Sequence, residues 1–319
     1  MESVHEPVLL HEIVEFLAGS KRSVEKGQPF VFLDCTFGGG GHSAAMAQAL
    51  KGELVAIGLD RDRQAVVRGR KLMSGLAEKS FIEEADFRNL GEILDRLGYA
   101  EINAVLFDLG LSSDELDPPA GQIGKGFSFR RDEPLLMTMG DPAKYPFTAS
   151  DIVNGWEESV LADIIFGYGE ERFARRIARA IVAYRAKKKI ETSLELAEIV
   201  RMAVPRTSSG RGHAGAKGAV FKRRIDPATK TFQALRIAVN DELKALEKGL
   251  KSAYAKLAKG GRMAVISFHS LEDGIVKRFF KEREKIDGAS VGKKPLGPSE
   301  EEILANPRSR SAKLRTLEK

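Results

Sequence analysis

This chain of 319 residues has little cysteine, little tryptophan and no long apolar run. Its one cysteine, Cys35, excludes an internal disulfide framework and any clustered zinc site, and we expect no metal. No apolar run approaches the length of a membrane span, and the N-terminus "MESVHEPVLLHEIVEFL" has acids where a signal peptide has bases. We therefore expect a cytoplasmic, globular protein without a membrane partner.

Acidic residues are also missing from two stretches that are rich in Lys and Arg. These are residues 206–224 and the segment "NPRSRSAKLR" (306–315). A solvated face or a mobile loop would explain one such stretch. Two of them, in a chain with a net charge of +6, favour a polyanionic partner.

In the first 110 residues, β-rich runs alternate with segments of helical apolar spacing. The runs are "PFVFLD" (29–34), "ELVAIGLD" (53–60), "SFIEEAD" (80–86) and "INAVLFDLG" (102–110). This alternation predicts an α/β fold of the Rossmann-like type, with a mostly parallel sheet covered by helices on both faces.

After residue 110 the alternation stops. Helical patterns follow at 170–188 and at 192–205, where Thr192 and Glu195 form a capping-box signature. One long helix is expected from about 226 to the glycines at 260–261, and then strands at 262–268 and 313–318. We predict a core made of 1–114 and 226–319. Residues 115–225 would form an inserted, mainly helical domain for substrate recognition, with a basic loop at 206–224.

Four aspartates lie at or just after the predicted strand ends: Asp34, Asp60, Asp86 and Asp108. The carboxyl ends of parallel strands meet at one edge of a sheet, and ligands bind beyond that edge. We therefore expect these side chains to share one site.

The segment "DCTFGGGGHS" (34–43) holds four consecutive glycines, and three interpretations compete for it. A triphosphate loop needs Gly-Lys-Ser/Thr, but His42 stands at the lysine position. A dinucleotide fingerprint fits better, since Gly38 and Gly40 match, although Ser43 replaces the third glycine. The third interpretation is a turn for a ligand without phosphate.

A carboxylate in front of the glycines favours that third interpretation. Asp34 would repel a pyrophosphate, whereas it would attract a ligand with an ammonium group. S-adenosylmethionine has an ammonium, a cationic sulfonium and no phosphate, and the bare turn lets it come close. Asp60 can accept its ribose hydroxyls and Phe87 can face its adenine, although each residue alone also fits a helix cap or a core aromatic.

Eight segments in order along nearly the whole chain resemble the bacterial ribosomal RNA small subunit methyltransferase H family. They are "HEPVLLHEIVEFL", "FLDCTFGGGGHS", "GLDRD", "LFDLGLSSDELD", "GFSFRRDEPLLMTM", "TFQALRIAVNDEL", "ISFHSLEDGIVKRFF" and "NPRSRSAKLR". The resemblance implies a class I methyltransferase fold and transfer of a methyl group from S-adenosylmethionine to the exocyclic N4 of one cytidine. That cytidine lies in the decoding region of 16S rRNA, within the small ribosomal subunit.

The resemblance also implies cofactor contacts at Gly40, Gly41, His42, Asp60, Phe87, Asp108 and Glu115. The chain departs from the family at Glu115, where Gln or His is usual, and at Leu136 and Thr138, where Asp and Arg are more common. The segment 206–219 is longer than usual. These departures weaken single contacts more than they weaken the resemblance.

Two residues at predicted strand ends are candidates for catalysis. Asp108 can accept the amine hydrogens of the base. However, the chain lacks the Pro-Pro-aromatic sequence of many amino-methyltransferases, so Asp108 can also serve the cofactor alone, with a carbonyl of Leu109 or Gly110 receiving the amine. His269 can orient the base or take the released proton, or it can cap the next helix and pair with Glu272.

Five residues are candidates for contact with the RNA. Arg236 and Asn240, four apart on one helix, would edge the RNA site. Phe127 and Phe129, with Arg130 beside them, have the composition of a lid that stacks on a splayed base, although the rings can also anchor a loop.

Three rival functions remain open at this point. They are a DNA amino-methyltransferase with the same core, a ribosome-binding assembly factor that keeps the ligand pocket without catalysis, and a nicotinamide dehydrogenase. A homo-oligomer is neither indicated nor excluded.

Overall fold

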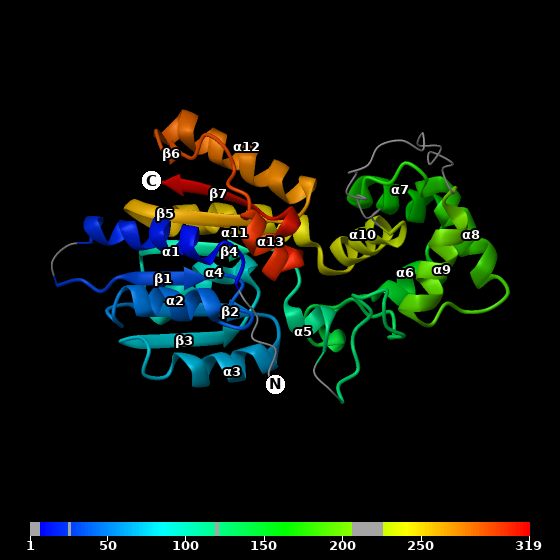
Figure 1. Ribbon diagram of the computed structural model, residues 1–319, viewed down its shortest axis with the longest axis horizontal. Coiled ribbons are helices and arrows are strands. Elements are labelled where there is room, and N and C mark those ends of the chain that lie inside the picture. The colour runs from blue at the N-terminus through cyan, green and yellow to red at the C-terminus, as the bar shows by residue number, and fades with distance from the viewer. Residues whose placement is uncertain (1–6, 25–26, 119–120, 206–225) are drawn as a thin grey trace. The chain divides into compact units, whose positions relative to one another are not determined.

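The computed structural model describes residues 7–24, 27–118, 121–205 and 226–319 (Figure 1). Its contacts divide the chain into two units: unit 1 is Met1–Ser112 with Glu242–Lys319, and unit 2 is Ser113–Asp241. Residues 226–241, which the sequence analysis assigned to the core, lie in unit 2, because α10 (Ala228–Asn240) packs against α7 (Glu158–Gly169).

Unit 1 is built on a seven-stranded sheet with the order β3-β2-β1-β4-β5-β7-β6. The strands are β1 (Val31–Asp34), β2 (Val55–Asp60), β3 (Lys79–Glu84), β4 (Ile102–Asp108), β5 (Leu257–Ser267), β6 (Ser290–Val291) and β7 (Lys313–Glu318). The pairs among β1 to β5 are parallel, and β7 is antiparallel to both β5 and β6. The predicted mostly parallel α/β sheet is therefore confirmed, as is the final strand at 313–318.

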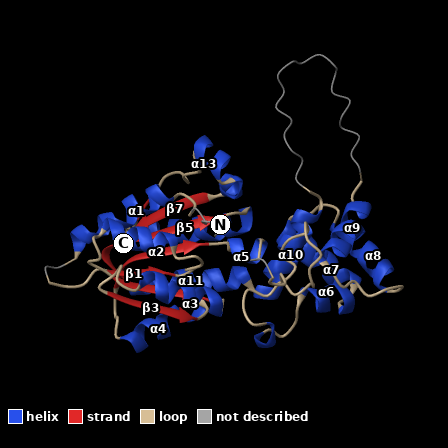
Figure 2. Ribbon diagram, turned by 60° about the horizontal axis from the view of Figure 1, so that its bottom comes forward, coloured by secondary structure: helices blue, strands red, loops and turns tan. Residues whose placement is uncertain are grey.

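Helices cover both faces of this sheet, which Figure 2 shows as a layer of red strands between blue helices. One apolar layer joins Phe32, Ala56 and Leu106 to α1 (Leu10–Ala18), α2 (Gly41–Ala49) and α3 (Arg63–Met73). The other joins Leu33 and Val105 to α4 (Leu90–Leu97), α11 (Glu242–Lys256) and α12 (Ser270–Asp287). Successive strand residues alternate between the two layers, so β1 and β4 are apolar on both faces.

The long helix expected from residue 226 onward is wrong, because the structure has two helices there. Asp241 adopts a left-handed conformation with φ of 48°, and it separates α10 from α11. The following strand also begins earlier than expected, at Leu257, so Gly260 and Gly261 lie inside β5 and do not end a helix. Sequence periodicity missed the break because helical apolar spacing continues on both sides of it.

Unit 2 is a group of helices: α5 (Ser113–Leu116), α6 (Ala149–Gly155), α7, α8 (Ala174–Arg185), α9 (Ser193–Ala203) and α10. The helical pattern at 170–188 is confirmed by α8, in which Ile177 and Ile181 are fully buried. Thr192 caps α9 as predicted, but the side chain of Glu195 instead accepts hydrogen bonds from Tyr184 and from the Glu191 N–H.

The basic segment 206–224 lies outside the described residues. In unit 1, α13 (Glu300–Ala305) precedes the second basic segment, in which Arg315 forms an ion pair with Asp273. Among the helices that the structure describes, none is long and apolar enough to cross a membrane.

Candidate active site

Three of the four aspartates end neighbouring strands at one edge of the sheet. Asp34 is the last residue of β1, Asp60 of β2 and Asp108 of β4, and these strands are adjacent in the sheet. Asp86 lies two residues beyond β3, where it caps a short 3-10 helix and pairs with Arg61 at 2.6 Å. The edge predicted from the sequence therefore exists, but Asp86 has a structural role in it.

The glycine turn is held by its own amides. The Gly38 N–H donates to Oδ2 of Asp60 at 2.7 Å, and the Gly40 N–H donates to the Phe37 carbonyl at 2.7 Å. Both glycines have positive φ, and α2 begins immediately after them. Since a phosphate is held by unengaged amides of such turns, these two hydrogen bonds argue against a phosphate cradle.

Packing explains why two of the glycines have no side chain. A Cβ on Gly40 would lie 2.5 Å from Cζ of Phe37, and a Cβ on Gly41 would lie 2.4 Å from Cγ of Pro7. From the sequence, close approach of a ligand is the expected reason for the bare backbone. For Gly40 and Gly41, the contacts in the structure come from the protein itself.

Asp34 ties the turn to the sheet. Its buried carboxylate accepts hydrogen bonds from the Ser43 hydroxyl at 2.7 Å and from the Thr36 N–H at 3.2 Å. Burial raises the pKa of Asp34 to about 6, against the lowering effect of these hydrogen bonds. The side chain thus fixes the turn and also places negative charge beneath it.

Asp60 is positioned to receive hydroxyl groups. Oδ1 accepts the Asp62 N–H at 2.7 Å and Oδ2 accepts the Gly38 N–H, so both oxygens are fixed in place. Burial raises the pKa of Asp60. Because a carboxylate oxygen accepts two hydrogen bonds, each oxygen can still accept one from a ribose hydroxyl.

Asp108 ends β4 with one buried carboxyl oxygen that has no hydrogen-bond partner in the described part of the chain. Its N–H donates to Oγ1 of Thr36 at 2.7 Å, and its Oδ2 lies 3.8 Å from Nδ1 of His42. Among the described residues, Oδ1 of Asp108 forms no hydrogen bond. Burial, with smaller contributions from the charges of Asp34 and Glu272, raises its pKa to about 8. A cationic ligand group beside Oδ1 would satisfy this carboxyl.

His42 links the turn to the N-terminal segment. Its Nε2 lies 3.0 Å from the Val8 carbonyl, which can only accept, so the ring donates through Nε2 and presents Nδ1 toward Asp108. His42 is buried on α2. The pair of His42 and Asp108 therefore places a ring nitrogen and a carboxyl at the same edge.

Phe87 lies three residues beyond β3, at the start of a short 3-10 helix, and packs against the core. Its ring meets Phe107 edge-on at 5.5 Å, and a Cβ on Gly249 would lie 2.8 Å from Cδ2 of Phe87. The ring is only partly buried. Its remaining surface suits an aromatic ligand at the carboxyl edge.

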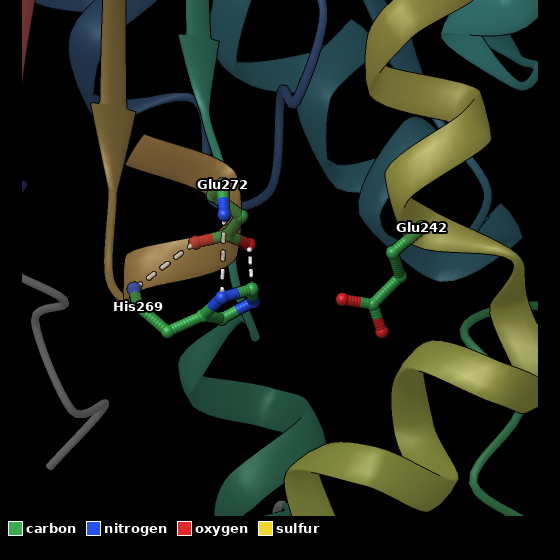
Figure 3. Close-up of side chains that lie close together, drawn as sticks. All are labelled: Glu242, His269 and Glu272. Carbon is green, nitrogen blue, oxygen red and sulfur yellow. Dashed lines mark hydrogen bonds and ion pairs between the residues drawn. The ribbon is translucent and has the colours of Figure 1, made fainter. Parts of the chain in front are cut away.

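His269 caps α12 and lies beside Glu272, which is the structural alternative that the sequence left open for this residue. Its Nδ1 accepts the Glu272 N–H at 3.4 Å, and Oε2 of Glu272 accepts the N–H groups of Phe268 and His269 at 2.9 and 3.3 Å. Because Nδ1 accepts, the proton of the neutral ring lies on Nε2. That nitrogen lies 3.1 Å from Oε1 of Glu272 (Figure 3).

Glu242 is a third member of this group, and the sequence analysis missed it. It is the first residue of α11, and its carboxylate is directed toward the His269 imidazole (Figure 3). Ligand-type atoms of Glu242, His269 and Glu272 all lie within 4.8 Å of one another. The signal available in the sequence is the acidic end of "TFQALRIAVNDEL", which the apolar spacing places in the interior of one long helix.

Asn240 does not lie free at an RNA site, which corrects the sequence prediction. It is 2% exposed, and its Nδ2 donates to the carbonyls of Met137 and Arg236 at 2.8 Å each. Its Oδ1 accepts the Met139 N–H at 2.9 Å. The amide is therefore used to hold the 137–139 segment against α10, while Arg236 is partly exposed on the same helix.

The two phenylalanines of the expected lid have anchoring contacts. Phe127 is 6% exposed, and Phe129 packs edge-on against Phe232 at 5.3 Å with Arg201 over its face. A buried ring is not available to stack on a base, so the lid interpretation of Phe127 is corrected to the anchoring alternative. Arg130, by contrast, is exposed.

The positions that depart from the family pattern all lie in unit 2. Glu115 is on α5, so it belongs to a different unit from the strand-end aspartates. Thr138 is fully buried, and its hydroxyl donates to the Gly140 carbonyl at 3.4 Å. Leu136 is partly buried, and its N–H donates to the Lys125 carbonyl. Leu136 and Thr138 thus occupy positions where the family more often has Asp and Arg, and these two side chains cannot form an ion pair.

Comparison with known proteins gives matches over the whole chain. The model of the MraW methylase family matches residues 2–319. A ribosomal RNA small subunit methyltransferase H of Carboxydothermus hydrogenoformans is 42% identical, with 100% of this chain and 99% of that protein covered. The proteins of the same name from Paramagnetospirillum magneticum and Sulfurihydrogenibium sp. are 43% and 44% identical, each covering 98% of this chain and 94% and 97% of their own length.

Proposed function

Because the chain belongs to the MraW methylase family, we propose that it methylates 16S rRNA at the exocyclic N4 of one cytidine in the decoding region. Methylation of small-subunit rRNA is supported by the names of relatives that match over nearly their full length. The resemblance of the sequence segments to the methyltransferase H family supports S-adenosylmethionine as the donor. The choice of N4 and of the decoding region is supported by the resemblance of the sequence segments to the methyltransferase H family.

The observation that carries this proposal is the edge formed by Asp60 and Asp108. Asp60 offers two fixed oxygens that suit ribose hydroxyls, and Asp108 offers a buried oxygen that lacks a hydrogen bond among the described residues. The turn between them has Gly38 and Gly40 amides already engaged, so it suits a ligand without phosphate. Residues of this kind fit S-adenosylmethionine, which has a ribose and cationic groups.

The proposed cofactor contacts divide by the part of the ligand that each residue suits. Asp60 would hold the ribose, Phe87 the adenine, and Asp108 the ammonium end. Gly40 and Gly41 would shape the turn, and His42 would support Asp108. Glu115, which the family resemblance adds to this set, lies on α5 of unit 2.

The reaction needs a nitrogen nucleophile, and cytosine offers a poor one. The N4 lone pair is delocalised into the ring, so the nitrogen must become pyramidal as it attacks. S-adenosylmethionine, when bound, supplies a methyl group that is already activated by its sulfonium. The chain's own residues must therefore align the amine with that methyl group and accept its hydrogens as positive charge develops. His269 lies just after β5, next to β4 and Asp108, where such residues are needed.

RNA from cells that lack this protein tests the proposal. We expect one N4-methyl group to be missing from one cytidine in the decoding region of 16S rRNA, and to return when the chain is expressed from a plasmid. An unchanged modification pattern would contradict the proposal. A change confined to DNA would favour a DNA amino-methyltransferase.

A further inference from the structure

We propose that Glu242 accepts a proton from the target amine, and that His269 positions the Glu242 carboxylate for this role. The inference rests on the proposed methyl transfer to a cytosine amine and adds a residue to it. Glu242 would touch the substrate, whereas His269 would act through Glu242.

The place of the group in the sheet is the first argument. The proposed cofactor residues of unit 1 follow β1, β2, β3 and β4, which are neighbours in the sheet. His269 and Glu272 follow β5, which pairs with β4 so that Asp108 is opposite Ile266. Glu272 is close enough to raise the pKa of Asp108 through its charge. The group therefore follows the strand next to Asp108, on the side away from β1 and β2, and leaves a place for the acceptor base beyond the same carboxyl edge.

The hydrogen bonds of the group are the second argument. Oε2 of Glu272 is committed to two backbone N–H groups, and Nδ1 of His269 is committed to a third. The side chains of His269 and Glu272 are 8% and 4% exposed, so they form a fixed base for the group. Nε2 of His269 is buried and forms no hydrogen bond of good geometry among the described residues, although Oε1 of Glu272 lies 3.1 Å away. Its proton is therefore available to the Glu242 carboxylate, which faces the ring (Figure 3).

Exposure separates the three residues by role. Glu242 is only partly buried, whereas the capping pair is nearly inaccessible. Glu242 is thus the member of the group that a base can reach.

The chemical step balances with this assignment. The N4 lone pair forms a bond to the methyl carbon, the carbon–sulfur bond breaks, and its electron pair stays on sulfur. The nitrogen then carries one hydrogen too many and a positive charge. Glu242 takes that proton, so the products are neutral N4-methylcytosine, neutral thioether and a protonated carboxyl that exchanges with water.

A divalent cation is the alternative occupant of the same three side chains. If a metal were bound through Nε2 of His269, the ring proton would have to move from Nε2 to Nδ1. The Nδ1–H would then point at the Glu272 N–H, which now donates a hydrogen bond to Nδ1. Two donors would then oppose each other and the cap of α12 would be lost. The hydrogen bonds of the group therefore favour a proton acceptor over a metal site.

Single-turnover methyl transfer by the full chain, with saturating S-adenosylmethionine and small ribosomal subunits lacking the modification, tests the inference. Glu242→Gln is expected to lower the rate constant at least about 100-fold, since general-base catalysis contributes roughly 10² to 10⁴. Its cofactor affinity, measured by calorimetry, should change less than about twofold. Glu247→Gln, an exposed glutamate on the same helix, is the matched control and should keep the wild-type rate.

Chemical rescue distinguishes a proton acceptor from a structural residue. Adding formate should restore transfer by Glu242→Ala in proportion to its concentration and should not affect Glu247→Ala. His269→Asn, which keeps a capping side chain but removes Nε2, should slow transfer about tenfold without loss of cofactor affinity.

Each outcome decides between the alternatives. A rate for Glu242→Gln within threefold of wild type overturns the inference, as does a slow Glu242→Ala that binds cofactor but does not respond to formate. Loss of transfer by wild-type protein that is treated with EDTA and desalted before the subunits are added, with recovery on addition of a divalent cation, also overturns it, because the three side chains would then be metal ligands. If the wild-type protein itself transfers no methyl group to RNA, the proposed function fails instead, so the two failures are distinguishable.

Discussion

Oδ2 of Asp108 lies 3.8 Å from Nδ1 of His42, while Nε2 of His42 is held by the Val8 carbonyl. The separation is too long for a hydrogen bond, so the imidazole does not satisfy the carboxyl. Burial, then the charge of Asp34, then that of Glu272 raise the pKa of Asp108 to about 8. A cationic ligand group beside Asp108 would therefore stabilise the ionised carboxylate. The affinity for the cofactor and the stability of the ligand-free protein should both depend on pH.

Cofactor affinity should rise with pH through Asp108. A cation binds best to the ionised carboxylate, which is a minor form at pH 6 because the pKa is about 8 in the absence of ligand. We expect the dissociation constant of S-adenosylmethionine to fall roughly 20-fold between pH 6 and pH 7.5, as measured by calorimetry. Asp108→Asn should bind weakly at both pH values, whereas Asp163→Asn, at an exposed position on α7, should keep the wild-type slope. A slope that survives in Asp108→Asn would contradict this.

The stability of the ligand-free protein should fall with pH for the same reason. The pKa of Asp108 is about 8 in the folded protein and about 3.9 in the unfolded chain. The protonated carboxyl therefore stabilises the folded state fully below about pH 3.9. This stabilisation is lost as the pH rises through the folded-state pKa of about 8. Between pH 5 and pH 8, wild type should lose on the order of a few kcal/mol relative to Asp108→Asn. Urea unfolding at several pH values measures the difference in the free energy of unfolding between wild type and Asp108→Asn. If burial does not raise the pKa of Asp108, this difference should not change with pH.

Gly40→Ala should be more destabilising than an alanine at another left-handed glycine. Gly40 has φ of 75° and its added Cβ would meet Phe37, whereas Gly75 has φ of 83° and no neighbour within 4 Å of the added Cβ. Strained backbone costs both variants about 1 kcal/mol, and the contact with Phe37 costs Gly40→Ala roughly 1–3 kcal/mol more. Thermal unfolding compares them. Equal losses would mean that packing against Phe37 does not require this glycine.

Asn240→Ala should loosen the 137–139 segment of unit 2. The substitution removes three hydrogen bonds to backbone groups, and each polar group left buried costs roughly 1–3 kcal/mol. Hydrogen exchange at the Met139 amide should become much faster, while the affinity for S-adenosylmethionine changes little. Unchanged protection of that amide, together with a selective loss of RNA affinity, would restore Asn240 as an RNA contact.

Much of unit 1 could be predicted from the sequence because its signals are local. Four apolar runs ended in or near aspartates, and parallel pairing alone then brought Asp34, Asp60 and Asp108 to one edge. The family resemblance, based on eight segments, is confirmed by the match over residues 2–319. The capping of α12 by His269 could also be foreseen, since a polar residue before Ser-Leu-Glu is typical of a helix start.

The failures involve contacts between residues distant in sequence. Asn240 is saturated by Met137 and Met139, about one hundred positions earlier, and no local pattern shows this. Glu242 was overlooked because the left-handed residue Asp241 interrupts an otherwise continuous helical pattern, and that break moves Glu242 to the start of a helix. The need for Gly40 and Gly41 comes from Phe37 and Pro7, which only the folded turn brings near.

The most direct test of the account is methyl transfer by the purified protein from tritiated S-adenosylmethionine. Small ribosomal subunits lacking the modification, naked 16S rRNA and duplex DNA are offered in parallel, and the products are digested to nucleosides. We expect the label in N4-methylcytidine from 16S rRNA, at a single position, and none in DNA. Label in another nucleoside or in DNA, or cofactor binding without transfer to any RNA, would contradict the account.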